Sequence, residues 1–256
     1  MAGSQREAGD EPVLELLRHA PMEVVGRITW SSNATFLVEL GGEATAAAQS
    51  GAAQNGLAGN GLFAIYKPER GERGLWDFPQ GLWKREVAAY ELSRWLGWDL
   101  VPPTVERYDA PVGAGSLQHW VDALAEEHYF TLLEDPRNRD TLQAIALFDL
   151  VVNNADRKAG HCLAGVDGRL WAIDHGVCFH EEPKLRTVIW DFAGEPLPGS
   201  LVADLAELAR GEVPETVARQ LGGRELEALV RRAKAVRSRR RFPHPVGDFP
   251  YPWPLI

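Results

Sequence analysis

Cysteine is scarce in this sequence, and two other features are missing from it. The 256 residues include two cysteines, Cys162 and Cys178, which are too few for a disulfide framework in a chain of this length. No run of about 18 apolar residues occurs, so no segment is expected to span a membrane. The opening residues lack the apolar core of a secretory signal. We therefore expect a cytoplasmic protein without a transmembrane segment.

Basic residues are fewer than acidic ones, with 27 Lys and Arg against 36 Asp and Glu and a formal net charge of -9. A nucleic-acid binder needs a basic face for the backbone phosphates, so this balance argues against nucleic acid as a partner. The length and the 45% hydrophobic content allow a sizeable core. One basic cluster, Arg231 to Arg241, is interpreted as the solvated face of a helix, with a binding patch as the alternative.

The first third of the chain alternates between polar and apolar segments. Residues 1–11 are polar and are expected to be disordered, and helical apolar spacing follows over Val13 to Ala20. Two strands are predicted within residues 22–40, around a polar turn. The segment Gly41 to Gly61 is rich in Ala, Gly, Gln and Asn, and we interpret it as a mobile insertion without core residues.

Two charged residues in the next segments form a possible pair. Leu62 to Pro68 reads as a buried strand that carries Lys67, and Trp83 to Trp98 has the spacing of an amphipathic helix with Glu86 near its start. Burying an ammonium without a partner is costly, so Lys67 is predicted to pair with a carboxylate or a phosphate. The alternatives are a lysine that reaches water and a glutamate that only favours its helix N-terminus.

The second half of the chain is predicted to begin after the strand-like run Ser116 to Ala123. A helical apolar stripe then ends at the pair Asn153 and Asn154. A strand, a tight turn at Asp167-Gly168 and a second strand ending at Asp174 come next, and the rest of the chain is mainly helical.

Asp156 and Asp174 are acidic residues on either side of this predicted hairpin. Hard oxygen ligands suit Mg²⁺, which bridges carboxylates to phosphates. With Lys67 and Glu86 upstream, the order becomes lysine, glutamate, loop aspartate and metal aspartate, which is the inventory for phosphoryl transfer. Taken alone, each aspartate is interpreted as a turn or cap residue.

The set of motifs resembles a known group of enzymes. The chain is similar to atypical kinases of the phosphatidylinositol 3-/4-kinase-like group, in particular type II phosphatidylinositol 4-kinases and HipA-like kinases, and to an actinobacterial family related to them. The matching segments are YKP at Tyr66–Pro68, REVAAYELSRWLGWDLVPPT at Arg85–Thr104, FDLVVNNADR at Phe148–Arg157 and AIDHG at Ala172–Gly176.

The resemblance implies an α+β, bilobal protein-kinase-like fold. Residues 12–121 would form a small β-sheet N-lobe with one helix and the hinge, and residues 122–256 would form a mainly helical C-lobe. Metal-bound ATP would lie between the two lobes, with Mg²⁺ or Mn²⁺ as the metal.

The resemblance also assigns roles to residues that would bind ATP. Lys67 would bind the phosphates and Glu86 would position it. The polar turn would add backbone N–H groups for the phosphates, and the hinge would hydrogen-bond adenine. The turn residues are Ser31, Ser32 and Asn33, and the hinge residues are Gln118, His119, Trp120 and Val121.

In the second lobe, the resemblance makes Asp156 the residue that orients or deprotonates the acceptor hydroxyl, braced by Arg157, and Asp174 the metal ligand. Asp149 is interpreted as a structural partner for Arg157. One position departs from the pattern: five residues after Asp156, where such kinases supply asparagine as a second metal ligand, this chain has His161. Imidazole is a poorer Mg²⁺ ligand than an amide oxygen but tolerates Mn²⁺ or Zn²⁺.

Two cysteines and two histidines lie close together in this part of the sequence, at His161, Cys162, His175 and Cys178. Their spacing fits no standard zinc pattern, and both cysteines lie in apolar runs. We therefore interpret the cysteines as small buried residues rather than as zinc ligands.

These patterns predict an ATP-dependent phosphotransferase with an open choice of acceptor: a protein, a small molecule or a lipid. Lipid has the least support, because no basic amphipathic helix opens the chain. The alternative that His161 raises is a pseudokinase that binds a nucleotide or a protein partner without turnover. A third possibility is nucleotidyl transfer from ATP.

Overall fold

The computed structural model describes residues 3–29, 33–41 and 61–256. The chain forms two compact units. The first unit consists of two segments, the chain up to Val87 and Pro102–Asp122. The second unit consists of Ala88–Val101 and Ala123–Ile256. That the units act as the lobes expected over 12–121 and 122–256 stays a prediction.

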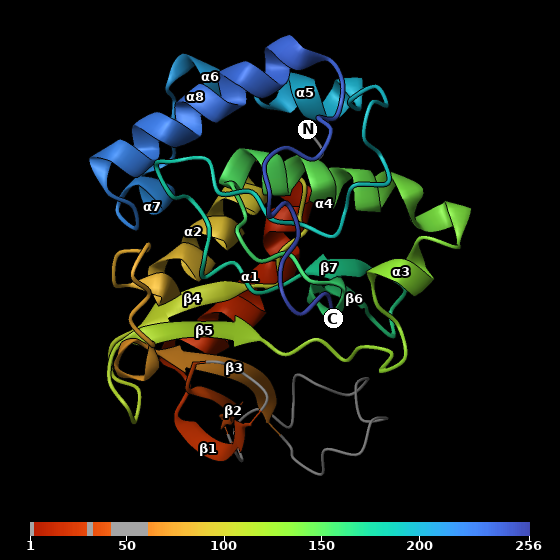
Figure 1. Ribbon diagram of the computed structural model, residues 1–256. Coiled ribbons are helices and arrows are strands. Elements are labelled where there is room, and N and C mark those ends of the chain that lie inside the picture. Colours follow the sequence, from red (N-terminus) through yellow and green to blue (C-terminus); the bar gives the residue numbers. More distant parts are fainter. Residues whose placement is uncertain (1–2, 30–32, 42–60) are drawn as a thin grey trace. The chain divides into compact units, whose positions relative to one another are not determined.

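The first unit is built on a five-stranded antiparallel sheet with the strand order β1-β2-β3-β5-β4 (Figure 1). Its strands are β1 (Met22–Ile28), β2 (Thr35–Leu40), β3 (Leu62–Pro68), β4 (Thr104–Arg107) and β5 (Gly115–His119). The two strands predicted within residues 22–40 and the strand over Leu62 to Pro68 are confirmed. The turn residues Ser31 and Ser32 and most of the predicted insertion at Gly41 to Gly61 lie outside the described residues.

Strand β3 lies at the centre of this sheet, between β2 and β5. Successive side chains of a strand point to opposite faces, and Ala64 and Tyr66 are fully buried on one face. Lys67 belongs to the other face, opposite Ser116 of β5 in the ladder. Because the side chains of β3 alternate between the two faces, Lys67, its single charged residue, points away from the core that buries Tyr66.

Disorder was expected for residues 1–11, but helix α1 (Gly3–His19) includes residues 3–11 of this segment, and residues 1 and 2 lie outside the described residues. The helix is anchored at its C-terminal end, because Leu14 and Leu17 are fully buried and Nη1 of Arg107 donates to the carbonyls of Leu17 at 2.8 Å and Ala20 at 3.2 Å. Once these turns are fixed, helix propagation adds one hydrogen bond per residue, so the polar stretch before them extends the helix. The prediction of disorder from polar composition was wrong because it did not take into account the buried helical turns that follow this segment.

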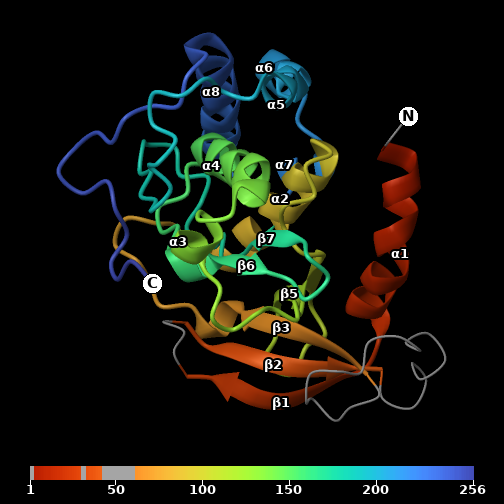
Figure 2. The same ribbon diagram turned by 90° about the vertical axis from the view of Figure 1, so that its right-hand side faces the viewer.

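The second unit is mainly helical, and α8 lies along α4 (Figures 1 and 2). It contains the C-terminal part of α2 (Leu82–Trp95), then α3 (Tyr129–Leu132), α4 (Arg139–Val152), β6 (Cys162–Ala164), β7 (Leu170–Ala172), α5 (Gly199–Asp204), α6 (Ala206–Arg210), α7 (Glu215–Ala218) and α8 (Gly223–Arg239), with short 3-10 turns at Pro136–Asn138 and Ala159–His161. The predicted hairpin is present, but its second strand ends at Ala172 and Asp174 has a positive φ of 61°. Among the described residues, no helix combines the length and apolarity needed to cross a membrane.

Shortening a buried side chain of α1 tests whether this helix belongs to the core of the first unit. We expect Leu17→Ala to lower the free energy of unfolding by about 2–5 kcal/mol, because the fully buried side chain would leave a cavity. Urea denaturation measures the change. The exposed neighbour Glu15→Ala is the control and should change stability by less than about 0.5 kcal/mol. A Leu17→Ala effect as small as that of the control would show that α1 is not packed in solution.

Candidate functional site

Lys67 and Glu86 form an ion pair within the first unit, between Nζ of Lys67 and Oε1 of Glu86. Lys67 comes from the end of β3 and Glu86 from the second turn of α2. The lysine side chain is 23% exposed and the glutamate side chain 3% exposed. A nearly buried carboxylate needs such a cation, because an unpaired charge in this position would carry its full desolvation cost. The partner predicted for Lys67 is therefore present, and the role of the pair in binding ATP stays a proposal.

The N-terminus of α2 is held by a carboxylate from the preceding loop. Oε2 of Glu72 accepts a hydrogen bond from the Gly81 N–H at 3.0 Å, and its Oε1 accepts one from the Trp83 N–H at 2.7 Å. These N–H groups have no partner within the helix, and a negative charge at a helix N-terminus is stabilising. Glu72 thus fixes the first turn of α2, and with it the position of Glu86 one turn later.

The turn between β1 and β2 is tied to the segment that follows β3. Oδ1 of Asn33 accepts a hydrogen bond from the Arg73 N–H at 2.9 Å, and the Ala34 N–H donates to the Gly71 carbonyl at 3.0 Å. A Cβ on Gly71 would lie 2.5 Å from that of Ala34, so this approach requires glycine. The side-chain oxygen of Asn33 is therefore occupied by a structural contact.

The predicted hinge continues from β5, and its first residues are bound into the sheet. The His119 N–H donates to the Pro103 carbonyl at 2.8 Å, and the Trp120 N–H donates to the Phe63 carbonyl at 3.0 Å. Nε2 of Gln118 donates to Oγ1 of Thr104 at 2.9 Å. Burial lowers the pKa of His119, and the charge of the nearby Asp122 partly opposes this shift. The backbone N–H groups of His119 and Trp120 are therefore already used within the sheet, and Val121 is the next residue along the hinge.

In the second unit, α4 ends at Val152, and the following C-cap residue Asn153 has a left-handed φ of 57°. The chain then turns sharply, and Asn154 shapes the turn with both ends of its amide. Its Nδ2 donates to Oδ1 of Asp149 at 3.0 Å, and its Oδ1 accepts from the Asp156 N–H at 2.9 Å. The predicted helix end at the asparagine pair is confirmed, and the pair positions the backbone of Asp156.

Arg157 is completely buried, and all five of its N–H donors are used. Nε and Nη2 bind the carboxylate of Asp149 at 2.9 and 3.0 Å, and the second hydrogen of Nη2 is directed to Nε2 of His175 at 2.9 Å. Nη1 donates to the carbonyls of His161 at 3.1 Å and Ile173 at 2.7 Å. The predicted pairing of Asp149 with Arg157 is therefore confirmed. One guanidinium joins α4, the loop before β6 and the segment after β7.

The contact with Arg157 also defines the state of His175. Arginine has no acceptor, so Nε2 of His175 must accept and the proton of the neutral ring lies on Nδ1. Burial opposes the charge on Arg157, but the Asp149 carboxylate outweighs burial and raises the pKa of the guanidinium above its usual value. The brace is therefore charged at any pH at which the protein is folded.

Asp156 lies beside Arg157 but points to a different partner. Its Oδ2 is 2.9 Å from Nζ of Lys158, and the side chain is 32% exposed. Burial raises the pKa of the Asp156 carboxyl, and the positive charge of Lys158 acts in the opposite direction. A partly exposed carboxylate whose pKa is raised is suited to accept a proton.

Asp174 and His161 face each other, with 3.3 Å between Oδ2 and Nε2. The Asp174 side chain is 46% exposed, as a ligand for an outside group requires. Nδ1 of His161 accepts a hydrogen bond from the Lys158 N–H at 3.3 Å, so the proton of the neutral ring lies on Nε2, facing Asp174. This arrangement makes His161 a donor that orients the carboxylate. Its predicted role as a direct metal ligand stays a prediction and would require a change of tautomer.

The two cysteines are both fully buried, as we interpreted them. Burial raises the pKa of the Cys162 thiol to about 12, which disfavours the thiolate that zinc requires. Among residues 3–29, 33–41 and 61–256, no group of three or more His, Cys, Asp and Glu side chains is arranged to hold a metal. A divalent metal at Asp174 would therefore also need oxygen atoms from a bound substrate.

Some residues of this arrangement had escaped the sequence reasoning. The cap by Glu72 and the acceptor role of His175 depend on contacts between distant segments, so no local pattern indicates them. The bridging role of Asn154 and the pairing of Lys158 with Asp156 had a local signal, because each of these polar residues is two positions from Asp156 in sequence.

No protein-family model matches the chain. A comparison of sequences finds 38% identity over 278 residues with Protein Rv2133c of Mycobacterium tuberculosis, covering 94% of this chain and 94% of that protein. The chain belongs to the family of Protein Rv2133c. An identity this high over almost the whole length of both proteins implies a common fold.

Solved structures identify the fold. The Golgi casein kinase with Mn/ADP bound matches with a TM-score of 0.54 at 14% identity, over 91% of this chain and 75% of that one. Hydra Fam20 with sugar matches with a TM-score of 0.54 at 16% identity, over 90% of this chain and 87% of that one. The predicted α+β kinase-like fold is thus confirmed, with an antiparallel five-stranded sheet followed by a helical region. Function has to be argued from the side chains, because likeness at this identity extends to the fold alone.

Removing the partner of Arg157 tests the brace. We expect Asp149→Ala to lower the free energy of unfolding by about 3–5 kcal/mol, because it leaves a buried guanidinium without its carboxylate. Urea denaturation followed by circular dichroism measures the loss. The double variant Asp149→Leu/Arg157→Met removes both charges and should cost less than Asp149→Ala alone. A double variant at least as unstable as Asp149→Ala would contradict the view that the unpaired charge is the main cost.

Proposed function

We propose that the protein is an ATP-dependent phosphotransferase that works with Mg²⁺ or Mn²⁺. The observation that carries this proposal is the ion pair of Lys67 with Glu86 on a kinase-like fold. In kinases a strand lysine held by a helix glutamate binds the phosphates of ATP. The Golgi casein kinase with Mn/ADP bound, which has this fold, supports a metal and adenine nucleotide as the ligand.

Each unit contributes its own groups to the proposed reaction. In the first, Lys67 would neutralise phosphate charge while Glu86 holds its ammonium in place, and the hinge around Val121 would hydrogen-bond the adenine. In the second, Asp156 would orient the acceptor hydroxyl and take its proton. Arg157 would act indirectly, by fixing the backbone on both sides of Asp156. Catalysis of this kind consists mainly of positioning and charge neutralisation.

The residues fit a divalent metal only in part, through the exposed carboxylate of Asp174. A bound metal would neutralise the negative charge that develops on the transferred phosphoryl group. Asp174 would hold it together with phosphate oxygens, which suits Mg²⁺ because this ion is usually bound by one or two carboxylates plus substrate phosphates. His161 would keep the carboxylate of Asp174 in its orientation.

The acceptor and the finer family assignment belong to the proposal. The motifs around Asp156 and Asp174 resemble those of type II phosphatidylinositol 4-kinases and HipA-like kinases. A protein or small-molecule acceptor has more support than a lipid, because the described part of the chain opens with α1, whose sequence is not that of a basic membrane helix. The cytoplasmic location stays a prediction.

Nucleotide binding is the first test. At about one hundred times the dissociation constant, ATP with Mg²⁺ or Mn²⁺ should stabilise the protein by about 2.7 kcal/mol and raise the melting temperature by roughly 5–10 °C. Differential scanning fluorimetry measures the shift. Asp174→Ala should abolish it, whereas Asp167→Ala in the exposed hairpin turn should leave it unchanged. No shift with any nucleotide and metal would refute the proposal.

Turnover separates the enzyme from a pseudokinase. Incubation with ATP and candidate acceptors, followed by mass spectrometry, should detect added phosphate, and Asp156→Asn should reduce the rate by about 10²–10⁴-fold while keeping the thermal shift. A thermal shift without any product would support the pseudokinase. Addition of AMP instead of phosphate would support nucleotidyl transfer.

The role of His161 can be tested through metal affinity. If its Nε2–H orients Asp174, His161→Leu should weaken Mn²⁺ binding in the presence of ATP by about 10–100-fold, as is typical when a residue behind a metal ligand is lost. His161→Asn should retain affinity, because its amide can donate to Asp174 or bind the metal. A Mn²⁺ titration followed by electron paramagnetic resonance measures both. Equal affinity for His161→Leu and the unchanged protein would exclude both roles of the imidazole.

A further inference from the structure

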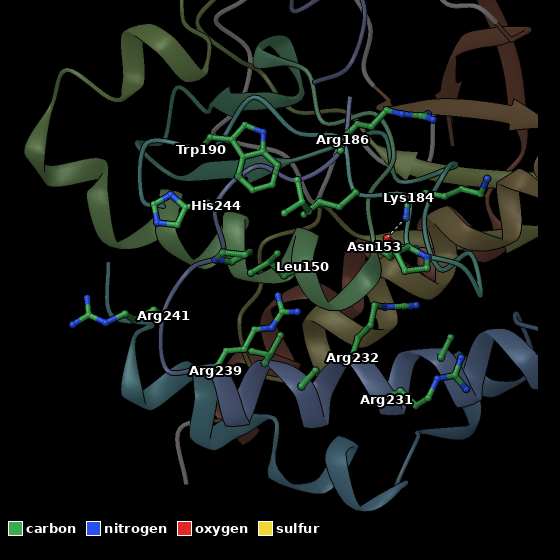
Figure 3. Close-up of a pocket in the computed structure, with 18 of the residues that line it drawn as sticks. Leu150, Asn153, Lys184, Arg186, Trp190, Arg231, Arg232, Arg239, Arg241 and His244 are labelled. Carbon is green, nitrogen blue, oxygen red and sulfur yellow. Dashed lines mark hydrogen bonds between the residues drawn. The ribbon is translucent and has the colours of Figure 1, made fainter. Parts of the chain in front are cut away.

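A cavity of about 640 Å³ lies within the second unit (Figure 3). It is lined by α8 from Ala228 onward, the end of α4, Leu197, and the segments 181–190 and 241–249. Sites for small molecules are typically clefts of about 300–1,000 Å³. The cavity therefore has the size of a ligand site. It contains none of the residues proposed above to bind ATP or the metal.

Positive charge is concentrated around this cavity, which we call the basic pocket. Six of its lining residues are cationic: Lys184, Arg186, Arg231, Arg232, Arg239 and Arg241. Its only acidic lining residue among those described is Glu181, which is itself 3.7 Å from Arg224. This excess occurs in a chain whose net charge is -9. Like charges that line one cavity repel each other, and an anion would relieve that repulsion.

Arg232 carries the strongest sign of an absent anion. Its Nε donates to the Val151 carbonyl at 2.8 Å and its Nη1 to the His180 carbonyl at 3.0 Å, and both of these partners are neutral. Its Nη2 is buried and has no hydrogen-bond partner among the described residues. Burial lowers the pKa of Arg232 to about 10, and the positive charge of Arg231 acts in the same direction. A cation with a buried donor that lacks a hydrogen-bond partner is costly unless an anion joins it.

Two other cations of the pocket are available to a ligand. The side chains of Arg186 and Arg239 make no hydrogen bond or ion pair with any residue that the structure describes. Figure 3 shows Arg239 extending from α8 toward Leu150, and Arg232 extending from α8 toward Asn153. Guanidinium groups bind phosphate oxygens through two parallel hydrogen bonds, which makes phosphate the anion that this arrangement fits best.

The pocket also has an apolar wall. Leu150, Trp190 and Val236 line it together with the cations, and Trp190 lies across from α8 in Figure 3. Inorganic phosphate would leave this apolar wall uncovered. The combination of an apolar wall and several guanidinium groups fits a molecule with one apolar part and one phosphorylated part.

The pocket shares a wall with the loop of Asp156. The Lys184 N–H donates to Oδ1 of Asn153 at 2.9 Å. The Arg186 N–H donates to the Asn154 carbonyl at 2.9 Å, and the Arg186 carbonyl accepts from the Arg157 N–H at 3.0 Å. Because the backbone of Arg186 is hydrogen-bonded to the loop of Asp156, a ligand held by the Arg186 side chain would contact a residue that borders this candidate catalytic loop.

We propose that the basic pocket binds a small phosphate monoester that carries an apolar group. The proposal does not depend on ATP binding by Lys67 and Asp174, because it uses a different set of residues. A membrane surface and a phosphorylated protein offer the same phosphate chemistry, but the ligand-sized volume and the apolar wall favour a small molecule.

The test uses 1-naphthyl phosphate as a probe, with 1-naphthol and inorganic phosphate as comparisons, in isothermal titration calorimetry at low salt. We expect 1-naphthyl phosphate to bind at least about tenfold more tightly than either comparison compound. Arg239→Gln and Arg186→Gln should each weaken it by about tenfold, because each removes a charge-assisted hydrogen bond. Arg237→Gln, on α8 but outside the pocket, is the matched control and should have no effect.

Several results would overturn the proposal. Equal binding of 1-naphthol would indicate an apolar cavity without phosphate recognition, and the absence of any binding by 1-naphthyl phosphate would exclude the site. Loss of binding in Lys67→Met, with Arg186→Gln and Arg239→Gln unaffected, would place the probe at the proposed nucleotide site instead. Binding only to phosphatidylserine vesicles, again sensitive to the two arginine variants, would replace the small molecule by a membrane surface.

Discussion

The guanidinium of Arg157 connects three separate segments, and the geometry of the second unit around Asp156 and Asp174 depends on this contact. It uses every donor that it has, on a carboxylate, two carbonyls and an imidazole, in a place without exposure to water. Arginine cannot give up its proton under ordinary conditions, and Asp149 stabilises its charge further. Any pH dependence of function should therefore arise from groups at the surface of the site, such as Asp156, and not from its scaffold.

Much of this molecule could be predicted from local patterns. The pattern of β3 indicated a strand, and helical spacing indicated α2 and α4. The cost of burying a charge indicated that Lys67 needs a carboxylate or a phosphate, and the place of Asp149 within α4 indicated a structural partner for Arg157. These inferences succeed because each depends on a short segment or on one strong physical penalty. The kinase-like fold followed from motifs whose order matched a known inventory.

Other features could not be predicted, because they are made by residues that are distant in sequence. Helix α1 begins earlier than its composition suggested, since Arg107 and the core hold its far end. The cluster from Arg231 to Arg241 was interpreted as a solvated face, which describes Arg237 but not Arg232. The sequence of α8 contains arginines on several sides of the helix. It gives no local sign that the loop near residue 186 and the C-terminal segment pack around Arg232.

The cap that Glu72 places on α2 bears on regulation. Many kinases are switched by moving the helix that carries the glutamate, which makes or breaks its pair with the strand lysine. In this chain the helix N-terminus is held by its own preceding loop, and Glu86 of the same helix is paired with Lys67. The position of Glu86 relative to Lys67 therefore depends on the loop that carries Glu72, so a change in that loop would disturb the pair without touching either of its members.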